Sequence, residues 1–242
     1  MEDLVGRFLT ARWIHLAMLN YEVEPAVLAS RVPAGTELDP WNGRTFVSIV
    51  GFHFLDTRVL GLPIPGHRNF DEVNLRFYVR RAAPEGMRRG VVFVREIVPR
   101  RAIAFVANRV YHERYVALPM RSEERLSESE GGSVSYAWRT GGRWNRLSLA
   151  VAGEPRLPDD ASEEAFITEH YWGYAGRPGG ATTEYRVEHP RWRVWRSIDA
   201  SLDCDVASFY GPEFAAPLAA PPSSAFLADG SEIVVRLGRR IG

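Results

Sequence analysis

Lysine is missing from the 242-residue sequence, so all 30 basic residues are arginines. Mutational bias in a GC-rich genome is the simplest cause of such a composition. The chemical consequence does not depend on that cause. No side chain of this protein can form a Schiff base with a carbonyl compound, because the α-amine of Met1 is the only primary amine. Phosphate-binding lysines of the Walker type and Ser-Lys catalytic dyads are excluded as well.

Cysteine and long apolar runs are almost as scarce. The single cysteine, Cys204, has no partner for an intrachain disulfide or a C-x-x-C pair. No stretch has the uninterrupted apolar length that a transmembrane helix needs. The acidic start, Glu2 and Asp3, does not lead into the apolar run of a signal peptide. We therefore expect a cytoplasmic protein with no membrane partner.

An excess of charge is also absent, since 30 acidic residues balance the 30 arginines. Nucleic-acid-binding proteins usually carry a basic excess, because neutralising phosphates supplies much of their affinity. Trp192 and Trp195, among arginines, could stack on bases, but strand alternation places them on opposite faces of a sheet. Four clustered arginines flank a Pro/Gly turn and suit a solvated hairpin tip: Arg80, Arg81, Arg88 and Arg89. We predict no nucleic-acid partner.

Strand-type patterns dominate what is present. Residues 44–55 are β-branched and aromatic on both faces, as in a strand buried on both sides, whereas residues 72–80 alternate cleanly. Gly141 and Gly142 mark a hairpin turn between two further strands, and we expect a second strand pair around Pro190. The predicted strands cover residues 10–23, 44–55, 72–80, 91–98, 134–139, 143–151, 182–189, 192–200 and 233–237.

Few helices are predicted. Residues 25–31 begin with proline, a favoured first helical residue, and residues 99–111 carry an apolar stripe at helical spacing. Residues 162–174 begin with a serine cap and two glutamates, and a short turn is expected at 203–210. The sequence thus predicts one α+β domain over residues 1–242, built on a mainly antiparallel sheet that is strongly curved or closed into a barrel.

One face of the 72–80 strand is polar and carries Glu72, Asn74, Arg76 and Tyr78. On an exposed sheet this face is simply the solvated side of an amphipathic strand, and the spacing by itself favours that interpretation. In a barrel it would line a cavity suited to a small polar ligand, an anionic one included. We expect Arg76 to point inward beside an acidic partner, with Glu72 as the first candidate.

Familiar catalytic and cofactor motifs are missing, and the six histidines show no metal-ligand spacing. A metal site would have to be assembled from distant strands, so we predict no metal and no cofactor. His189 follows the apolar alternation of Tyr185 and Val187, and His53 follows a similar alternation on its own strand. Each suits a hydrogen-bonded core histidine, although in a barrel His189 would also face the cavity.

Four segments resemble one bacterial family, the YqjF-like proteins, which is defined by a domain of unknown function. Residues 70–79 (FDEVNLRFYV) resemble its E-V-N-x-R-x-Y-V strand. Residues 166–174 (FITEHYWGY) resemble a helix ending in E-R-Y-x-x-Y, with His170 in place of the arginine. Residues 187–192 (VEHPRW) resemble a V-x-H-x-P-W motif, although here the proline directly follows His189. Residues 32–39 (VPAGTELD) resemble an early L-P-x-G-x-x-x-D element, and the match runs through nearly the whole chain.

The resemblance implies an acetoacetate-decarboxylase-like fold, in which a curved antiparallel sheet forms a cone-like, partly open barrel around a cavity, with helices outside. Decarboxylases of that superfamily use a Schiff-base lysine, which this sequence cannot supply. Their acidic residue on the neighbouring strand corresponds, by this resemblance, to Glu72. The resemblance also favours the cavity-lining interpretation of the polar face.

Two function classes follow from these observations. The first is a small-molecule-binding protein or enzyme whose cavity is lined by Glu72, Asn74, Arg76, Tyr78 and His189. In it Arg76 would pair with a carboxylate or enolate, while Glu72 or His189 would handle protons. The second is a non-catalytic binding or interaction domain on the same fold. A homo-oligomer is compatible with either class.

Overall fold

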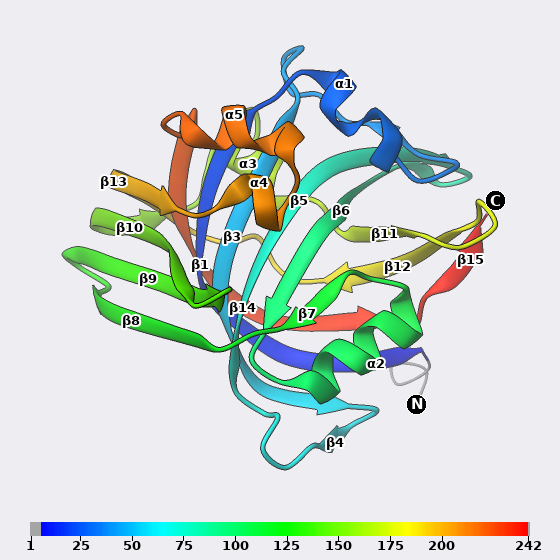
Figure 1. Cartoon of the computed structure of the whole chain (residues 1–242), viewed down its shortest axis with the longest axis horizontal. Coiled ribbons are helices and arrows are strands. Elements are labelled where there is room, and N and C mark those ends of the chain that lie inside the picture. The colour runs from blue at the N-terminus through cyan, green and yellow to red at the C-terminus, as the bar shows by residue number, and fades with distance from the viewer. Residues whose placement is uncertain (1–5, 242) are drawn as a thin grey trace.

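Far more residues of the chain lie in strands than in helices (Figure 1). The computed structural model describes residues 6–241. The longer strands are β1 (Arg7–Glu22), β3 (Phe46–Val59), β5 (Phe70–Ala83), β6 (Gly86–Val98), β8 (Met120–Ser127), β9 (Gly131–Thr140), β10 (Arg143–Arg156), β12 (Thr182–Glu188), β13 (Val194–Asp203) and β14 (Ser224–Arg236). The shorter ones are β2 (Glu37–Leu38), β4 (Leu62–Pro63), β7 (Tyr115–Ala117), β11 (Trp172–Gly176) and β15 (Arg239–Ile241).

The helices are short and lie outside the strands (Figure 1). They are α1 (Pro25–Leu28), which continues as a 3-10 turn (Ala29–Arg31), α2 (Arg101–Tyr111), α3 (Glu163–Thr168), α4 (Val206–Phe209) and α5 (Ala215–Ala219). A further 3-10 turn spans Pro212–Phe214. Within the described part of the chain, no helix has the length and apolar character needed to cross a membrane.

One sheet curls until it meets itself. Its strands run in the order β12–β11–β6–β5–β3–β1–β14, and a short pairing of β14 with β12 closes the ring. Beyond β14 the sheet continues as β13–β10–β9–β8, an outer layer on one side of the ring (Figure 1). Neighbours are antiparallel except β6 with β7 and with β11. The predicted fold class, a mainly antiparallel sheet forming a partly open barrel, is confirmed.

Strand β5 explains how the ring can have two buried faces. Val73, Leu75, Phe77 and Val79 alternate into the core between the ring and the outer layer, and all are fully buried. The opposite, polar face is also buried, with Arg76 its most exposed member at 9%. The polar side chains therefore point to the inside of the ring rather than to solvent.

Two local predictions are wrong. The helix expected over residues 162–174 ends at Thr168, because residues 172–176 pair with β6 and β12 as strand β11. The strands on either side of Pro190 do not pair with each other, since β12 joins β11 and β14 whereas β13 joins β10 and β14. Both corrections reflect ring closure, in which long-range pairing overrides local propensity. The predicted helix at 99–111 begins two residues later, at Arg101.

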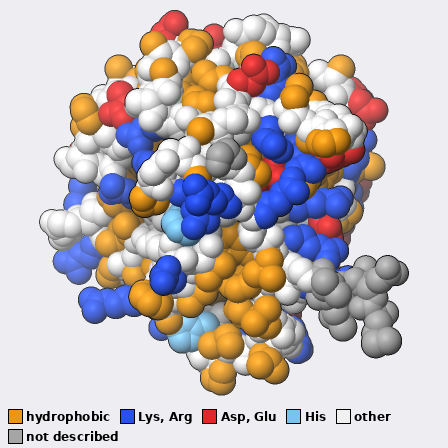
Figure 2. Space-filling model, turned by 90° about the vertical axis from the view of Figure 1, so that its right-hand side faces the viewer, with side chains coloured by type: hydrophobic (Ala, Val, Ile, Leu, Met, Phe, Trp, Pro, Cys, Tyr) orange, Lys and Arg blue, Asp and Glu red, His pale blue; other side chains and the backbone are white. Residues whose placement is uncertain are grey.

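Helix α2 and the loop at residues 60–69 lie at one end of the ring. Ile103 and Val106 of the predicted apolar stripe line the ring interior, and so do Ile64 and His67 of the loop. Exposed apolar side chains remain at this end, including Phe105, which is 70% exposed. Figure 2 shows hydrophobic side chains gathered over the lower half of the neighbouring face, below a group of arginines.

Candidate functional site

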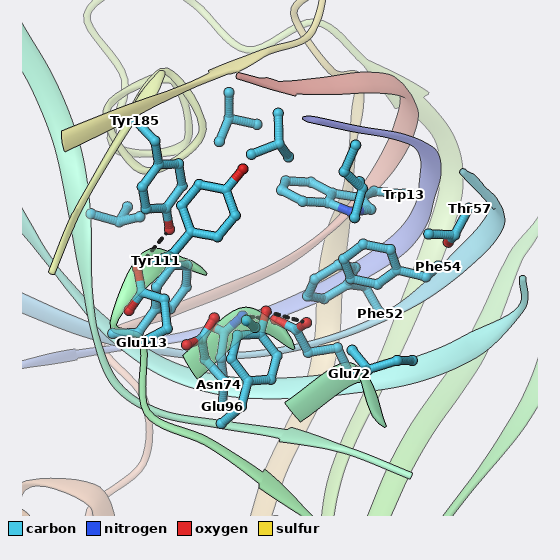
Figure 3. Close-up of a pocket in the computed structure, with 18 of the residues that line it drawn as sticks. Trp13, Phe52, Phe54, Thr57, Glu72, Asn74, Glu96, Tyr111, Glu113 and Tyr185 are labelled. Atoms are coloured by element: carbon cyan, nitrogen blue, oxygen red, sulfur yellow. Dashed lines mark hydrogen bonds between the residues drawn. The ribbon is translucent and has the colours of Figure 1, made fainter. Parts of the chain in front are cut away.

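A cavity of about 330 Å³ occupies the interior of the ring. Its wall is largely aromatic and aliphatic, which suits an organic molecule more than a bare ion. The aromatic part is formed by Trp13, Phe52, Phe54, Phe70, Phe93 and Trp192. In Figure 3, Trp13, Phe52 and Phe54 lie on one side of the cavity and Glu113 on the other, with Glu72 and Glu96 along the bottom of the view.

Three glutamates form that group: Glu72 on β5, Glu96 on β6 and Glu113 after α2. All are at most 8% exposed. Asn74 Nδ2 donates to Glu72 Oε1 at 2.9 Å, and the Tyr115 hydroxyl donates to Glu72 Oε2 at 3.0 Å. On the other side of the group, the Tyr185 hydroxyl donates to Glu113 Oε1 at 2.8 Å (Figure 3). Glu96 Oε2 and Asn74 Oδ1 have no hydrogen-bond partner among the described residues, 6–241.

Burial changes the acidity of all three carboxyl groups. Desolvation raises the pKa of Glu72 to about 7 and that of Glu113 to about 8, because an apolar surrounding disfavours the charged form. The pKa of Glu96 is raised well above its ordinary value by desolvation and then by the nearby Glu113 and Glu72 charges. Near neutral pH the group therefore holds protons that it can donate or exchange.

Arg76 supplies the positive charge of the cavity. Its Nη2 lies 3.4 Å from the Ile167 carbonyl oxygen and 3.8 Å from the Met18 sulfur. Its Nε is buried and has no hydrogen-bond partner in the part of the chain that the structure describes. The expected ion pair with Glu72 does not form, and no carboxylate within residues 6–241 pairs with Arg76. The positive charge of Arg76 nevertheless offsets part of the rise in the pKa of Glu72 that burial causes.

Two neutral histidines stand near Arg76. His189 stacks on Trp192 with ring centroids 4.0 Å apart, and its Nδ1 donates to the Pro190 carbonyl at 2.8 Å. Burial lowers its pKa to about 4, and the Arg76 charge contributes. His170 is similar, since desolvation lowers its pKa to about 4. Its Nε2 lies 3.1 Å from Asp39 Oδ2, and its buried Nδ1 has no hydrogen-bond partner within residues 6–241.

Comparison with known families shows to which family this chain belongs. A model of the family DUF2071, described as an uncharacterized conserved protein, matches residues 10–232. The chain belongs to the DUF2071 family. A curated relative, the uncharacterized protein YqjF of Bacillus subtilis (strain 168), is 31% identical over 125 residues. That alignment covers 51% of this chain and 48% of YqjF, so it spans about half the length of the relative.

Solved structures share the fold of this DUF2071 member. The enduracididine biosynthesis enzyme MppR, with HEPES buffer bound, superposes with a TM-score of 0.71 at 13% identity, over 99% of this chain and 90% of MppR. MppR has also been solved in complex with pyruvate. Acetoacetate decarboxylase from Legionella pneumophila gives a TM-score of 0.67 at 11% identity, over 97% of this chain and 87% of that one. The acetoacetate-decarboxylase-like fold is thus confirmed.

Four of the five residues predicted from sequence line the cavity of this DUF2071 member: Glu72, Asn74, Arg76 and His189. Tyr78 lies on the same strand face but is not part of the lining. Its hydroxyl is 2.6 Å from the Ser48 hydroxyl, and its ring packs on His170. Four further cavity residues were not predicted from the sequence: Glu96, Glu113, Tyr115 and Tyr185. His170, which also lines the cavity, stood out in the sequence only as a departure from the family pattern.

Glycine at position 173 makes room for one cavity residue. A Cβ there would lie 2.1 Å from Tyr185 Cζ and 2.4 Å from its hydroxyl oxygen. We therefore expect Gly173→Ala to displace Tyr185, break its bond to Glu113 and lower the free energy of unfolding by about 1–3 kcal/mol, the usual cost of overpacking. Denaturant unfolding measures this. Gly176→Ala on the same strand, where a Cβ meets nothing within 4 Å, is the matched control. Equal stability of the two variants would contradict the expectation.

Proposed function

We propose that this protein binds a small organic acid inside the ring, with the acid group against Arg76 and an apolar body on the aromatic wall. The observation that carries the proposal is a guanidinium only 9% exposed, in a largely apolar cavity, without a carboxylate partner among residues 6–241. A buried charge without a partner is costly, so a purely structural position would favour an apolar side chain. An anionic ligand would supply the missing partner.

The neighbouring groups support an anionic ligand rather than competing with it. His170 and His189 are neutral near pH 7, and a pKa of about 8 keeps the Glu113 carboxyl group largely protonated. Desolvation shifts the pKa of Glu96 in the same direction. Protonated carboxyl groups do not repel an anion, and they donate hydrogen bonds. The cavity therefore offers one cation together with several neutral donors.

A keto acid fits this arrangement best. Its carboxylate would pair with Arg76, and its carbonyl oxygen would accept a hydrogen bond from a protonated glutamate. Two fold neighbours support this class, since one is an acetoacetate decarboxylase and MppR has been solved with pyruvate. At about 330 Å³ the cavity exceeds the size of pyruvate, so we favour a keto acid with an apolar side chain.

Such a complex cannot react through an imine with a lysine side chain, because the chain has no lysine. Glu72 is placed for general acid–base catalysis, since its pKa of about 7 lets it both give and take a proton near neutral pH. A reversible proton transfer next to the carbonyl group is the reaction that these residues support. If no proton is transferred, the same contacts describe a non-catalytic ligand-binding domain.

One experiment tests both binding and the absence of an imine. We expect titration of the full chain with phenylpyruvate, measured by calorimetry, to show saturable binding of one ligand per chain. The methyl ester of phenylpyruvate should bind at least about 10-fold more weakly. Borohydride added to the complex should leave the protein mass unchanged. Equal binding of acid and ester would refute the role of Arg76, and a mass adduct would refute reversible binding.

A further inference from the structure

A second cluster of functional side chains lies outside the cavity, between the ring and the outer layer. It contains His15 on β1, His53 on β3 and Glu124 on β8, and one ligand atom from each lies within 4.8 Å of the other two. On β3, Phe52 and Phe54 point into the cavity and His53 alternates to the other face. The cluster is therefore separate from the proposed acid-binding site.

Two nitrogens converge on one oxygen in this cluster. Glu124 Oε2 is 2.9 Å from His15 Nδ1 and 3.2 Å from His53 Nε2. Zinc bonds of about 2.0–2.1 Å in tetrahedral geometry place neighbouring ligand atoms about 3.3 Å apart. Both observed nitrogen–oxygen distances are close to this value.

The orientation of His53 gives a second, independent indication. Asp71 Oδ1 lies 2.7 Å from His53 Nδ1, so that nitrogen donates its proton to a carboxylate. This contact holds the ring so that Nε2 faces Glu124, 3.2 Å away, where the deprotonated nitrogen can offer its lone pair to a cation. A carboxylate behind a ligating histidine is a recurrent feature of zinc sites.

The backbone at His15 also serves the cluster. His15 has a φ of +53°, uncommon for a residue other than glycine, at a register irregularity between Ile14 and Ala17. Bulges of this kind re-aim a side chain. The Tyr136 hydroxyl fixes the distorted segment by donating to the His15 carbonyl at 2.8 Å.

From these contacts we propose that His15, His53 and Glu124 form a Zn²⁺ site, with Asp71 as the residue that positions His53. Two imidazoles and one carboxylate leave a fourth coordination position, as in catalytic zinc sites. His15 and His53 are partly accessible and Glu124 is exposed, so that position can be reached from solvent. Because β8 is an edge strand paired only with β9, the ion would also fasten the outer layer to the ring.

The test uses the full chain stripped of metal with a chelator and titrated with Zn²⁺ alone. We expect one ion per chain by calorimetry, a rise in Tm, and, with Co²⁺ instead, the strong visible absorption of a four-coordinate ion. Glu124→Gln and His15→Asn should each weaken binding at least about 10-fold and abolish that absorption. Asparagine is chosen because it tolerates positive φ. Glu123→Gln, an exposed neighbour on the same strand, is the matched control and should bind like the wild type.

Asp71→Asn separates positioning from ligation. It should weaken Zn²⁺ binding about 10- to 100-fold while the Co²⁺ spectrum at saturation is retained, because the three ligands remain. Two results would overturn the proposal. One is no Zn²⁺ binding or Tm shift in the wild type, which would make the cluster a hydrogen-bonded network only. The other is equal Zn²⁺ affinity in Glu124→Gln and Glu123→Gln, which would place the ion elsewhere.

Discussion

Replacing Arg76 with methionine is expected to weaken the binding of phenylpyruvate about 10- to 100-fold. A hydrogen bond between charged groups contributes about 1.5–3 kcal/mol, and each 1.4 kcal/mol is about a factor of ten in Kd. Thermal stability should hold or rise. Methionine keeps much of the side-chain volume and removes a buried charge, and the donor bonds lost are the long ones to the Ile167 carbonyl and the Met18 sulfur.

Arg95→Met is the matched control for this substitution. Arg95 lies on β6, is half-buried, and stacks over the Phe209 ring at 4.7 Å, away from the cavity lining. Ligand affinity should be unchanged in this variant. If Arg76→Met instead lowers Tm sharply, and no carboxylate binds the wild type, then Arg76 is a structural residue and the proposed site is wrong.

Raising the pH from about 6 to 9 is expected to destabilise the wild type, and Glu113→Gln should remove the part of that loss that Glu113 causes. Glu72 and Glu96, whose pKa values are also raised, contribute to the remainder. The folded state raises the pKa of Glu113 from its ordinary 4.5 to about 8. Its contribution to stability is therefore complete below pH 4.5 and is lost as the pH rises through 8. A shift of this size corresponds to an effect on the order of a few kcal/mol.

Glutamine mimics the protonated acid and still accepts the Tyr185 hydrogen bond, so Glu113→Gln should match the wild type near pH 5 and exceed its Tm at pH 9. Urea unfolding at several pH values measures the slope. Glu24→Gln, at an exposed residue, should keep the slope of the wild type. Asp39 and Glu184 have lowered pKa values and lose their contributions only in acid, so they leave this range undisturbed. A variant less stable at every pH would contradict the expectation.

The alternation along β5 was enough to predict a core face and a polar face, but the spacing alone favoured solvent for the polar face, and only the family resemblance favoured a cavity. The strand belongs to the middle of the ring, where the period of two decides which side chains meet. Glu113 could not be found in the same way, because it lies in a connection after α2 and reaches the cavity only through the placement of that helix. His15, His53 and Glu124 likewise come from three strands, and only the register of β1, β3 and β8 brings them together.

The pairing of β1 with β14 joins segments from opposite ends of the described chain: Leu9 lies beside Val235 and Asn20 beside Ser224. A contact of such long sequence separation forms late, because a long loop must first be closed. During synthesis, β1 can pair with β3 early, but its other edge must wait until β14 has left the ribosome. The cavity is therefore complete only when the last long strand, β14, has paired. A nascent or truncated chain without β14 exposes an unpaired strand edge and part of the apolar interior to chaperones and proteases.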